Sequence, residues 1–494
     1  MRARTAMVLC AVAAACSSHG SSSSPGDAGS DASTQDGGGS DGSMSGKDGG
    51  NGTDGGDAGS GTETGGGGVD GGVGLEAGPI TGLTGTTYYV SDSSGSDGNA
   101  GTSRTTAWKT IQHAGGLLSP GDTVVVLAGT YDGAVFGWDT APCQGDPLCT
   151  VAGTSTNPVL FEADPTAAAG SVVIAAKNAH TDSGFDLQPG CDYVDIVGFT
   201  VTNAGTADMG AGTITKAGIA VAGSTGNRIL YNTVDGISGI GGILVDGVTG
   251  VLVQDNTLTN VVGTGTTGHG MYVSGSSVGV QVIGNVLHDN DYVGIHVNGD
   301  VSEGLPGVVK NTLIAGNLIY DNGQNGINAD GIQSSIIENN VIYGNKRNGI
   351  ELYQIDAYGG STGNVIVNNT IDQSMTAGSY AISIGACAYD NQSSQPTPAG
   401  CTAAPDDTST GNIAFDNVLL GASGPTSDVA SDDLSTSTNL TTASAGLFVN
   451  SAGGNYQLAP GGPGVGTGIA TFGGASAPAT ASGGHDIGAF SFAQ

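Results

Sequence analysis

Basic and aromatic side chains are scarce in this chain. Of its 494 residues, 11 are Lys or Arg against 44 Asp or Glu, and only 5% are aromatic. The formal net charge of −33 argues against nucleic acid and anionic membrane surfaces as partners, because both would repel the chain. With 91 Gly and few large side chains, ordinary globular packing is unfavourable, and repetitive β-structure with many tight turns is favoured instead.

The N-terminus has the features of an export signal. Met1-Arg2-Ala3-Arg4 precedes an apolar run to Ala15 that is too short to span a membrane. Ala13-Ala14-Ala15-Cys16 resembles the lipobox of bacterial lipoproteins, in which the Cys becomes the lipidated first residue. We therefore expect residues 1–16 to be a lipoprotein signal and the protein to be lipid-anchored to the outer membrane or cell surface; ordinary secretion with cleavage nearby is the alternative.

Residues 17–86 are rich in Gly, Ser and Asp and have almost no apolar side chains. Such a segment cannot bury enough surface to offset the entropy lost on ordering, so we expect a disordered tether. Export also implies an oxidising compartment, in which we expect local disulfides between Cys143 and Cys149 and between Cys387 and Cys401. Cys191 is left over, and its apolar neighbours predict a buried thiol. No Cys/His spacing resembles a zinc site.

Two interleaved signatures recur at intervals of 23 to 32 residues. One is an Ile, or a similar residue, that follows a Gly; the other is an Asn followed two residues later by a branched aliphatic. The first begins at Gly218, Gly242, Gly270, Gly294, Gly326, Gly349 and Ala381, and the second at Asn232, Asn256, Asn285, Asn317, Asn340 and Asn369. Each interval is too short to form a domain, so the pattern predicts a solenoid in which every repeat is one coil of short strands.

The ordered region is predicted to span residues 87–494. Trp108, Ile111 and Gly115 have helical spacing, so we expect a short amphipathic helix over 107–115 that covers the open end of the first coil. The runs at 94–98, 101–103, 108–111, 120–124 and 129–131, together with 455–458 and 486–490, resemble secreted right-handed parallel β-helix proteins of the pectate lyase-like superfamily. The resemblance implies an all-β, single-stranded right-handed parallel β-helix. Its members include polysaccharide lyases, hydrolases, epimerases and non-catalytic adhesins.

Alternation along the repeated strands predicts two outward columns of side chains. The first column is Ala220, Leu244, Tyr272, His296, Asn328, Glu351 and Ser383, and the second is Ala222, Asp246, Ser274, Asn298, Asp330, Tyr353 and Gly385. Successive coils are roughly 4.8 Å apart, so the polar members of the middle four coils should cluster. A solvated outer face would also be polar, but it explains less well why one stretch alone carries a His, two Tyr and two carboxylates.

Several residues outside the columns add to this cluster. They are His269, Asp300, Lys310, Lys346 and Arg347. The interval from Gly294 to Gly326 is among the longest, and an insertion at 303–310 lies within it. Long loops of solenoids commonly wall a binding cleft, so we expect a cleft beside the columns.

The cluster is compatible with β-elimination of an acidic extracellular polysaccharide. A base removes the proton beside a carboxylate while a cation neutralises that carboxylate. Candidates for the base and the proton donor are His296, Tyr272 and Lys310; candidates for Ca²⁺ ligands are Asp300, Asp330 and Glu351; candidates for substrate binding are His269, Asn298, Asn328, Tyr353 and Arg347. The calcium carboxylate cluster and catalytic base of calcium-dependent pectate lyases have no match in this sequence.

Two other functions remain open at this point. Asp330 and Glu351 on adjacent coils would lie about 8 Å apart, which suits the two carboxylates of an inverting glycoside hydrolase. A lipid-tethered, non-catalytic module that binds glycan or acts as a spacer is the third possibility. The sequence favours a lyase-like, monomeric, surface-anchored protein that acts on an extracellular polysaccharide.

Overall fold

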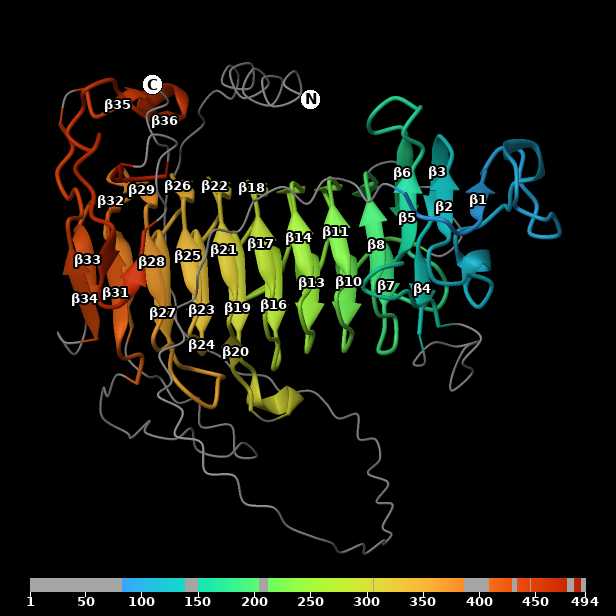
Figure 1. Cartoon of the computed structure of the whole chain (residues 1–494), viewed down its shortest axis with the longest axis horizontal. Helices are drawn as coiled ribbons and strands as arrows, with labels where there is room; N and C mark the ends of the chain where they lie inside the picture. The colour runs from blue at the N-terminus through green and yellow to red at the C-terminus, as the bar shows by residue number, and fades with distance from the viewer. Residues whose placement is uncertain are drawn as a thin grey trace, which may run out of the picture. The chain divides into compact units, whose positions relative to one another are not determined.

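The computed structural model describes residues 82–137, 150–203, 212–304, 306–385, 408–428, 433–444, 446–477 and 484–489. All of them belong to one compact unit, Gly72–Gln494. Its strands stack in parallel into three long sheets that run along a solenoid (Figure 1). Each coil contributes one strand to each sheet in turn, as when β10, β11 and β12 are followed by β13 of the next coil.

The three sheets are named A, B and C here. Sheet A contains β1 (Thr87–Val90), β2 (Thr123–Val126), β5 (Val159–Ala163), β8 (Val194–Val197), β11 (Arg228–Leu230), β14 (Leu252–Gln254), β17 (Gln281–Ile283), β21 (Leu313–Ala315), β25 (Ile336–Glu338), β28 (Val365–Val367), β31 (Asn412–Phe415) and β34 (Leu434–Ser437). Sheet B contains β3 (Gly129–Asp132), β6 (Val172–Ala176), β9 (Thr200–Thr202), β12 (Thr233–Asp235), β15 (Thr257–Thr259), β18 (Val286–His288), β22 (Leu318–Tyr320), β26 (Val341–Tyr343), β29 (Thr370–Gln373) and β32 (Val418–Gly421). Sheet C contains β4 (Ala134–Phe136), β7 (Phe185–Leu187), β10 (Ala217–Ala222), β13 (Gly241–Asp246), β16 (His269–Ser274), β19 (Ile295–Asn298), β23 (Ile327–Asp330), β27 (Ile350–Tyr353), β30 (Tyr380–Ile384) and β33 (Gly424–Asp428).

The repeated apolar residues form the core of the solenoid. From β4 to β30 of sheet C the first inward position of each coil, such as Ile219, Ile295 and Ile350, is fully buried. The second inward position, two residues later, is also fully buried, as at Val297 and Leu352. The predicted solenoid is therefore confirmed, and period-two alternation accounts for which side chains enter the core.

The repeated Asn residues form a second internal stack, which lies where each coil turns from sheet A to sheet B. The Oδ1 of Asn317, for example, accepts hydrogen bonds from the backbone N–H of Asn285 at 2.9 Å and from its Nδ2 at 3.0 Å. The residue before each Asn adopts a positive φ, as at Tyr231 and Asp255, which makes the turn. The ladder comprises Asn232, Asn256, Asn285, Asn317, Asn340, Asn369, Asn417 and Asn439.

The N-terminal cap is not the continuous helix expected over 107–115. It consists of two 3₁₀ helices, η2 (Arg104–Thr106) and η3 (Gln112–Ala114). Between them Trp108 pairs with Val90 as an extra bridge on the edge of β1, so its backbone groups are unavailable for a helix. Trp108, Ile111 and Ala114 are nevertheless buried, and they cover the first coil as the sequence predicted.

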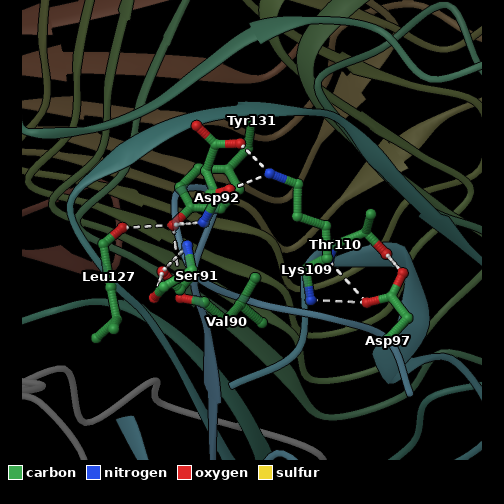
Figure 2. A network of polar contacts seen from close by, with 9 residues as sticks. Val90, Ser91, Asp92, Asp97, Lys109, Thr110, Leu127 and Tyr131 are labelled. Atoms are coloured by element: carbon green, nitrogen blue, oxygen red, sulfur yellow. Dashed lines mark hydrogen bonds and ion pairs between the residues drawn. The ribbon is translucent and has the colours of Figure 1, made fainter. Parts of the chain in front are cut away.

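Polar contacts hold this cap in place (Figure 2). The Asp97 carboxylate accepts from the backbone N–H groups of Lys109 at 2.7 Å and Thr110 at 3.0 Å. The Lys109 ammonium group pairs with the Asp92 carboxylate at 2.8 Å, and the Tyr131 hydroxyl donates to the Leu127 carbonyl at 2.8 Å. Asp97 thus joins the loop at 94–98 to the segment between the two 3₁₀ helices.

The C-terminal region forms two hairpins that pack on the outer faces of the last coils. A hairpin of β35 (Phe448–Asn450) and β36 (Asn455–Leu458), which flank η6 (Ser451–Gly453), packs Leu447 and Leu458 against Val418 and Leu420. A second hairpin, β37 (Thr471–Phe472) and β38 (Ala475–Ser476), packs against Phe415 of sheet A. Val418, Leu420 and Phe415 alternate with Leu419 and Ala414 of the main core, so both hairpins pack outside that core.

Several sequence predictions lie outside the described residues. They are the signal with Cys16, the tether over 17–81, and the cysteines Cys143, Cys149, Cys387 and Cys401. Cys191 is described, and it is a buried free thiol, as predicted. Burial raises its pKa to about 11. No helix within the described ranges is long and apolar enough to cross a membrane.

Candidate active site

Strand register in sheet C confirms both predicted columns. Parallel pairing aligns Tyr272 with His296, then Asn328, then Glu351. The same strands align Ser274 with Asn298, then Asp330, then Tyr353. The columns are less open to solvent than expected, because Asn298, Asn328 and Asp330 are 5%, 9% and 1% exposed.

Two imidazoles meet at the start of the polar stretch. His269 begins β16 and is 1% exposed, so the structure does not support it as a substrate-binding residue. Its Nε2 lies 3.2 Å from Nδ1 of His296, and its ring contacts Tyr272 and Tyr292 with centroids 5.2 and 5.3 Å apart. The outer nitrogen of His296, Nε2, is buried and has no hydrogen-bond partner among the described residues. A base needs an accessible nitrogen, so this geometry does not support His296 as the base.

Burial of the imidazole pair gives a prediction about acid stability. Desolvation lowers the pKa of His269 to about 4, and desolvation together with the neighbouring His269 lowers the pKa of His296 well below its ordinary value. In the unfolded chain these imidazoles bind protons near pH 6.5, whereas in the folded chain they do not. Their contribution to stability is therefore complete above that pH and is lost as the pH falls towards 4. Between pH 6.5 and pH 4 we expect the free energy of unfolding to fall by about 3 kcal/mol because of His269 alone. Urea unfolding at several pH values measures this fall. In the His269→Gln variant the free energy of unfolding should fall less steeply as the pH is lowered. If it falls as steeply as in the wild type, the pH dependence does not come from His269.

Asp330 anchors a loop and does not face a substrate. Its carboxylate accepts from the backbone N–H groups of Ile355 at 2.9 Å and Asp356 at 2.5 Å, and more distantly from Ala357 at 3.4 Å. Burial raises its pKa to about 7 despite these hydrogen bonds. Because its oxygen atoms are turned to the loop backbone, the geometry does not support Asp330 and Glu351 as an inverting pair.

The segment that holds the predicted insertion packs against the loop that Asp330 anchors. It begins with η5 (Val301–Glu303), whose first turn Asp300 caps by accepting from Ser302 N at 2.7 Å. The insertion is bound to the loop at 354–361, because Val301 N donates to the Asp356 carbonyl and Tyr358 N donates to the Gly307 carbonyl, both at 3.1 Å. These two loops pack together beside Asp330 of the second column, and neither lines the pocket at Glu351.

The expected calcium ligands do not gather. Asp300 caps a turn, Asp330 holds a loop, and Glu351 lies on the other column. Among the residues that the structure describes, no three His, Cys, Asp or Glu side chains are grouped closely enough to hold a metal ion. Lys310 also lies apart from the columns, in the two-stranded corner sheet of β20 (Val309–Lys310) and β24 (Ile332–Gln333).

A pocket of about 300 Å³ opens beside the first column at Glu351. Its lining includes the exposed cations Lys346 and Arg347 and the half-buried Tyr380. The remaining lining residues are Asn348, Ala377, Gly378 and Ser383. Only 11 of the 494 residues are Lys or Arg, so two adjacent cations in one pocket are a marked local exception to the acidic charge of the chain.

A network of amides positions the acidic and phenolic groups of β27. Asn325 Nδ2 donates to Glu351 Oε2 at 2.6 Å and to Asn328 Oδ1 at 2.9 Å. Asn328 Nδ2 donates in turn to the Tyr353 hydroxyl oxygen at 2.6 Å. Burial raises the pKa of Tyr353 well above its ordinary value, so the phenol keeps its proton. A carboxylate and a protonated phenol therefore lie two residues apart on one face of β27.

Asn325, Asn348 and Tyr380 were not predicted from the sequence as site residues. Each comes from the turn or strand start beside a repeated Gly or Ala, as Asn325 precedes Gly326 and Tyr380 precedes Ala381. The recurring pair itself marks where a turn enters sheet C, so polar residues one position before it could have been considered. Tyr272 and Asn298 are brought together, with Asn298 Nδ2 donating to the Tyr272 hydroxyl oxygen at 2.8 Å, but neither lines the pocket.

Comparison with known proteins agrees with this architecture. Residues 217–404 match a family model described as a right handed beta helix region. The chain is similar to the solved structure of pectate lyase Pel9A, with a TM-score of 0.53 and 15% identity over 82% of this chain and 96% of that chain. It is also similar to a rhamnogalacturonan lyase, with a TM-score of 0.50 and 14% identity over 74% and 91%. No curated protein sequence matches it. The chain is an all-β protein that folds as a right-handed parallel β-helix.

Proposed function

We propose that this protein cleaves an acidic extracellular polysaccharide by β-elimination in the pocket beside Glu351. The observation that carries the proposal is the placement of Lys346 and Arg347 next to a column carboxylate in a strongly acidic chain. The resemblance of the N-terminus to a lipoprotein signal supports a site of action at the cell surface, with the lipid on Cys16. The two solved structures named above are lyases by name, and at 14–15% identity they support the proposal through the fold alone.

Three pocket side chains and the neighbouring Tyr353 each have one task in this reaction. Arg347 and Lys346 bind the carboxylate of the reacting sugar, which makes the adjacent C–H bond more acidic. Glu351 accepts the proton from that carbon, a C=C bond forms, and the neighbouring C–O bond breaks. Tyr353 donates its proton to the departing oxygen. Glu351 and Tyr353 are two residues apart along β27, or about 7 Å at their Cα atoms, so they can serve neighbouring atoms of one sugar linkage.

Elimination is preferred to hydrolysis because the pocket holds one carboxylate. An inverting hydrolase needs two carboxyl groups that flank the linkage. Asp330, the second candidate, has its oxygen atoms turned to the backbone of 355–357. Elimination needs one proton acceptor, a proton donor and a partner for the substrate carboxylate, and Glu351, Tyr353 and Arg347 provide these.

The proposal is tested by incubating the protein with a panel of uronate polysaccharides. Elimination produces an unsaturated sugar end, which absorbs in the ultraviolet, so we expect absorbance to rise. Arg347→Ala should raise KM by about 10-fold, since a hydrogen bond to a charged group is lost. New reducing ends without absorbance would instead establish hydrolysis, and neither product would make the protein a binding or structural module. Loss of activity with EDTA would restore the calcium hypothesis.

A further inference from the structure

Three polar side chains continue the pocket towards the N-terminal coils. Arg347 Nη1 donates to Gln324 Oε1 at 3.3 Å, and Gln324 Nε2 donates to the Tyr292 hydroxyl oxygen at 3.3 Å. The three residues occupy the turns that enter β27, β23 and β19, so they lie on successive coils. Tyr292, Gln324 and Arg347 are named the edge row here.

The edge row is held in place before any ligand arrives. Arg347 N donates to the Gln324 carbonyl at 3.1 Å, and the Arg347 carbonyl accepts from Gln373 Nε2 at 2.6 Å. The Tyr292 ring meets the buried His269 ring edge to face, with centroids 5.3 Å apart. Side chains fixed in this way lose little entropy when they bind a ligand. Gln324 and Tyr292 are only half-buried, so part of each remains open to solvent.

We propose that Gln324 and Tyr292 form two further sugar subsites, so that the protein binds three consecutive units of an acidic polysaccharide laid across the coils. This inference rests on the proposed function, because the first unit is the one whose carboxylate binds Arg347. Coils repeat at roughly 4.8 Å, a spacing comparable to one pyranose unit and its linkage. The Gln324 amide can donate to and accept from sugar hydroxyls, and the Tyr292 ring offers an apolar face beside a hydroxyl.

The neighbouring turns limit the edge row to three units. On the N-terminal side Tyr292 N donates to the carbonyl of Gly268, which has no side chain to offer a ligand. On the C-terminal side the equivalent position, two residues before Ala381, is Ser379, which is buried and whose hydroxyl donates to the Gln373 and Thr376 carbonyls, both at 2.7 Å. The row has its one cation at Arg347, so only the unit bound there has to be acidic. The second and third units are recognised through hydroxyls and the ring face.

The experiment is calorimetric titration with galacturonate and alginate oligomers of one to four units. For wild-type protein we expect the affinity to rise about fivefold to 10-fold with the second unit and again with the third, and to stay constant with the fourth. Gln324→Ala should lose the gain from the second unit, and Tyr292→Ala should lose the gain from the third. Tyr292→Phe keeps the ring and separates the contribution of the hydroxyl. Gln281→Ala, on the outer face of β17 in sheet A, is the control and should bind every oligomer as wild type does.

The outcomes separate this inference from the function on which it rests. One outcome is that one-unit ligands bind and both alanine variants gain affinity with oligomer length as the wild type does. That outcome refutes the two subsites but leaves the proposed pocket unaffected. If Gln324→Ala weakens all lengths equally, Gln324 acts only by positioning Arg347, and its subsite is refuted. If no oligomer binds to wild-type protein, the proposed function fails and the subsites fail with it. Urea midpoints of the variants equal to wild type exclude misfolding as the cause.

Discussion

Replacing Glu351 by Gln should lower kcat by about 100-fold or more and leave KM within about twofold, because it removes the proton acceptor without removing the carboxylate-binding cations. Gln has nearly the shape of Glu, and its Oε1 can still accept the hydrogen bond that Asn325 Nδ2 makes to Glu351. The fold and the pocket should therefore survive the substitution. Steady-state kinetics on the polysaccharide that gives an unsaturated product measures both constants.

His296→Gln is the matched comparison for this variant. His296 lies on the same column two coils earlier, and its Nε2 is buried in the structure. We expect this variant to keep kcat within about threefold of wild type, because its imidazole takes no proton from the substrate. The reverse result, a full loss with His296→Gln and little change with Glu351→Gln, would make His296 the base and would require its Nε2 to open on binding.

The columns could be predicted from the sequence because they depend on regular geometry. Alternation decides which side chains leave the core, and parallel stacking of the repeated pairs decides which of them are neighbours. The alignment of His296 with Asn328 and Glu351 needed nothing more, and strand pairing confirms it.

Access to the columns could not be predicted in this way. It depends on the loops at 299–308 and 354–361, whose lengths are irregular and whose backbone N–H groups need partners. Asp330 provides those partners, so a residue that the alternation turns outward became buried. The burial of His269 follows from its position before the column, where Tyr292 from the next coil packs against it. Asp330 belongs to a column and His269 lies just before one, and only tertiary contacts distinguish these two polar residues from Glu351.

The position of the pocket has a similar origin. Lys346 and Arg347 belong to the turn before β27, and turn residues have no fixed alternation from which to infer their direction. Their place follows from the buried Asn345 of the same turn, whose Nδ2 donates to the Ile319 carbonyl of the coil before. Buried amides thus align the turns as well as the strands, and this alignment brings charges of one turn to the edge of a column.

The Asn ladder between sheets A and B is the feature of the fold on which the site depends most. A strand shifted by one residue would exchange its inward and outward side chains. Asn317 joins neighbouring coils, because Nδ2 donates to the Val282 carbonyl at 2.9 Å and Oδ1 accepts from Asn285 N at 2.9 Å. We expect Asn317→Ala to lower the free energy of unfolding by about 4 kcal/mol, since two buried backbone groups lose their partners.

Urea unfolding and hydrogen exchange measure this effect and its location. Coils of a solenoid contact mainly their neighbours, so amide protection should fall first in the coils on either side of Asn317 and less at the two ends. The control is Gln281→Ala, whose carboxamide is half-exposed on β17, and it should change the free energy by about 0.5 kcal/mol or less. Equal midpoints for the two variants would mean that the ladder fills the turns without stabilising them. A large loss of unfolding free energy, with amide protection lost mainly in the coils beside Asn317, would show that buried amides hold each coil in register. This register places Glu351 beside Arg347.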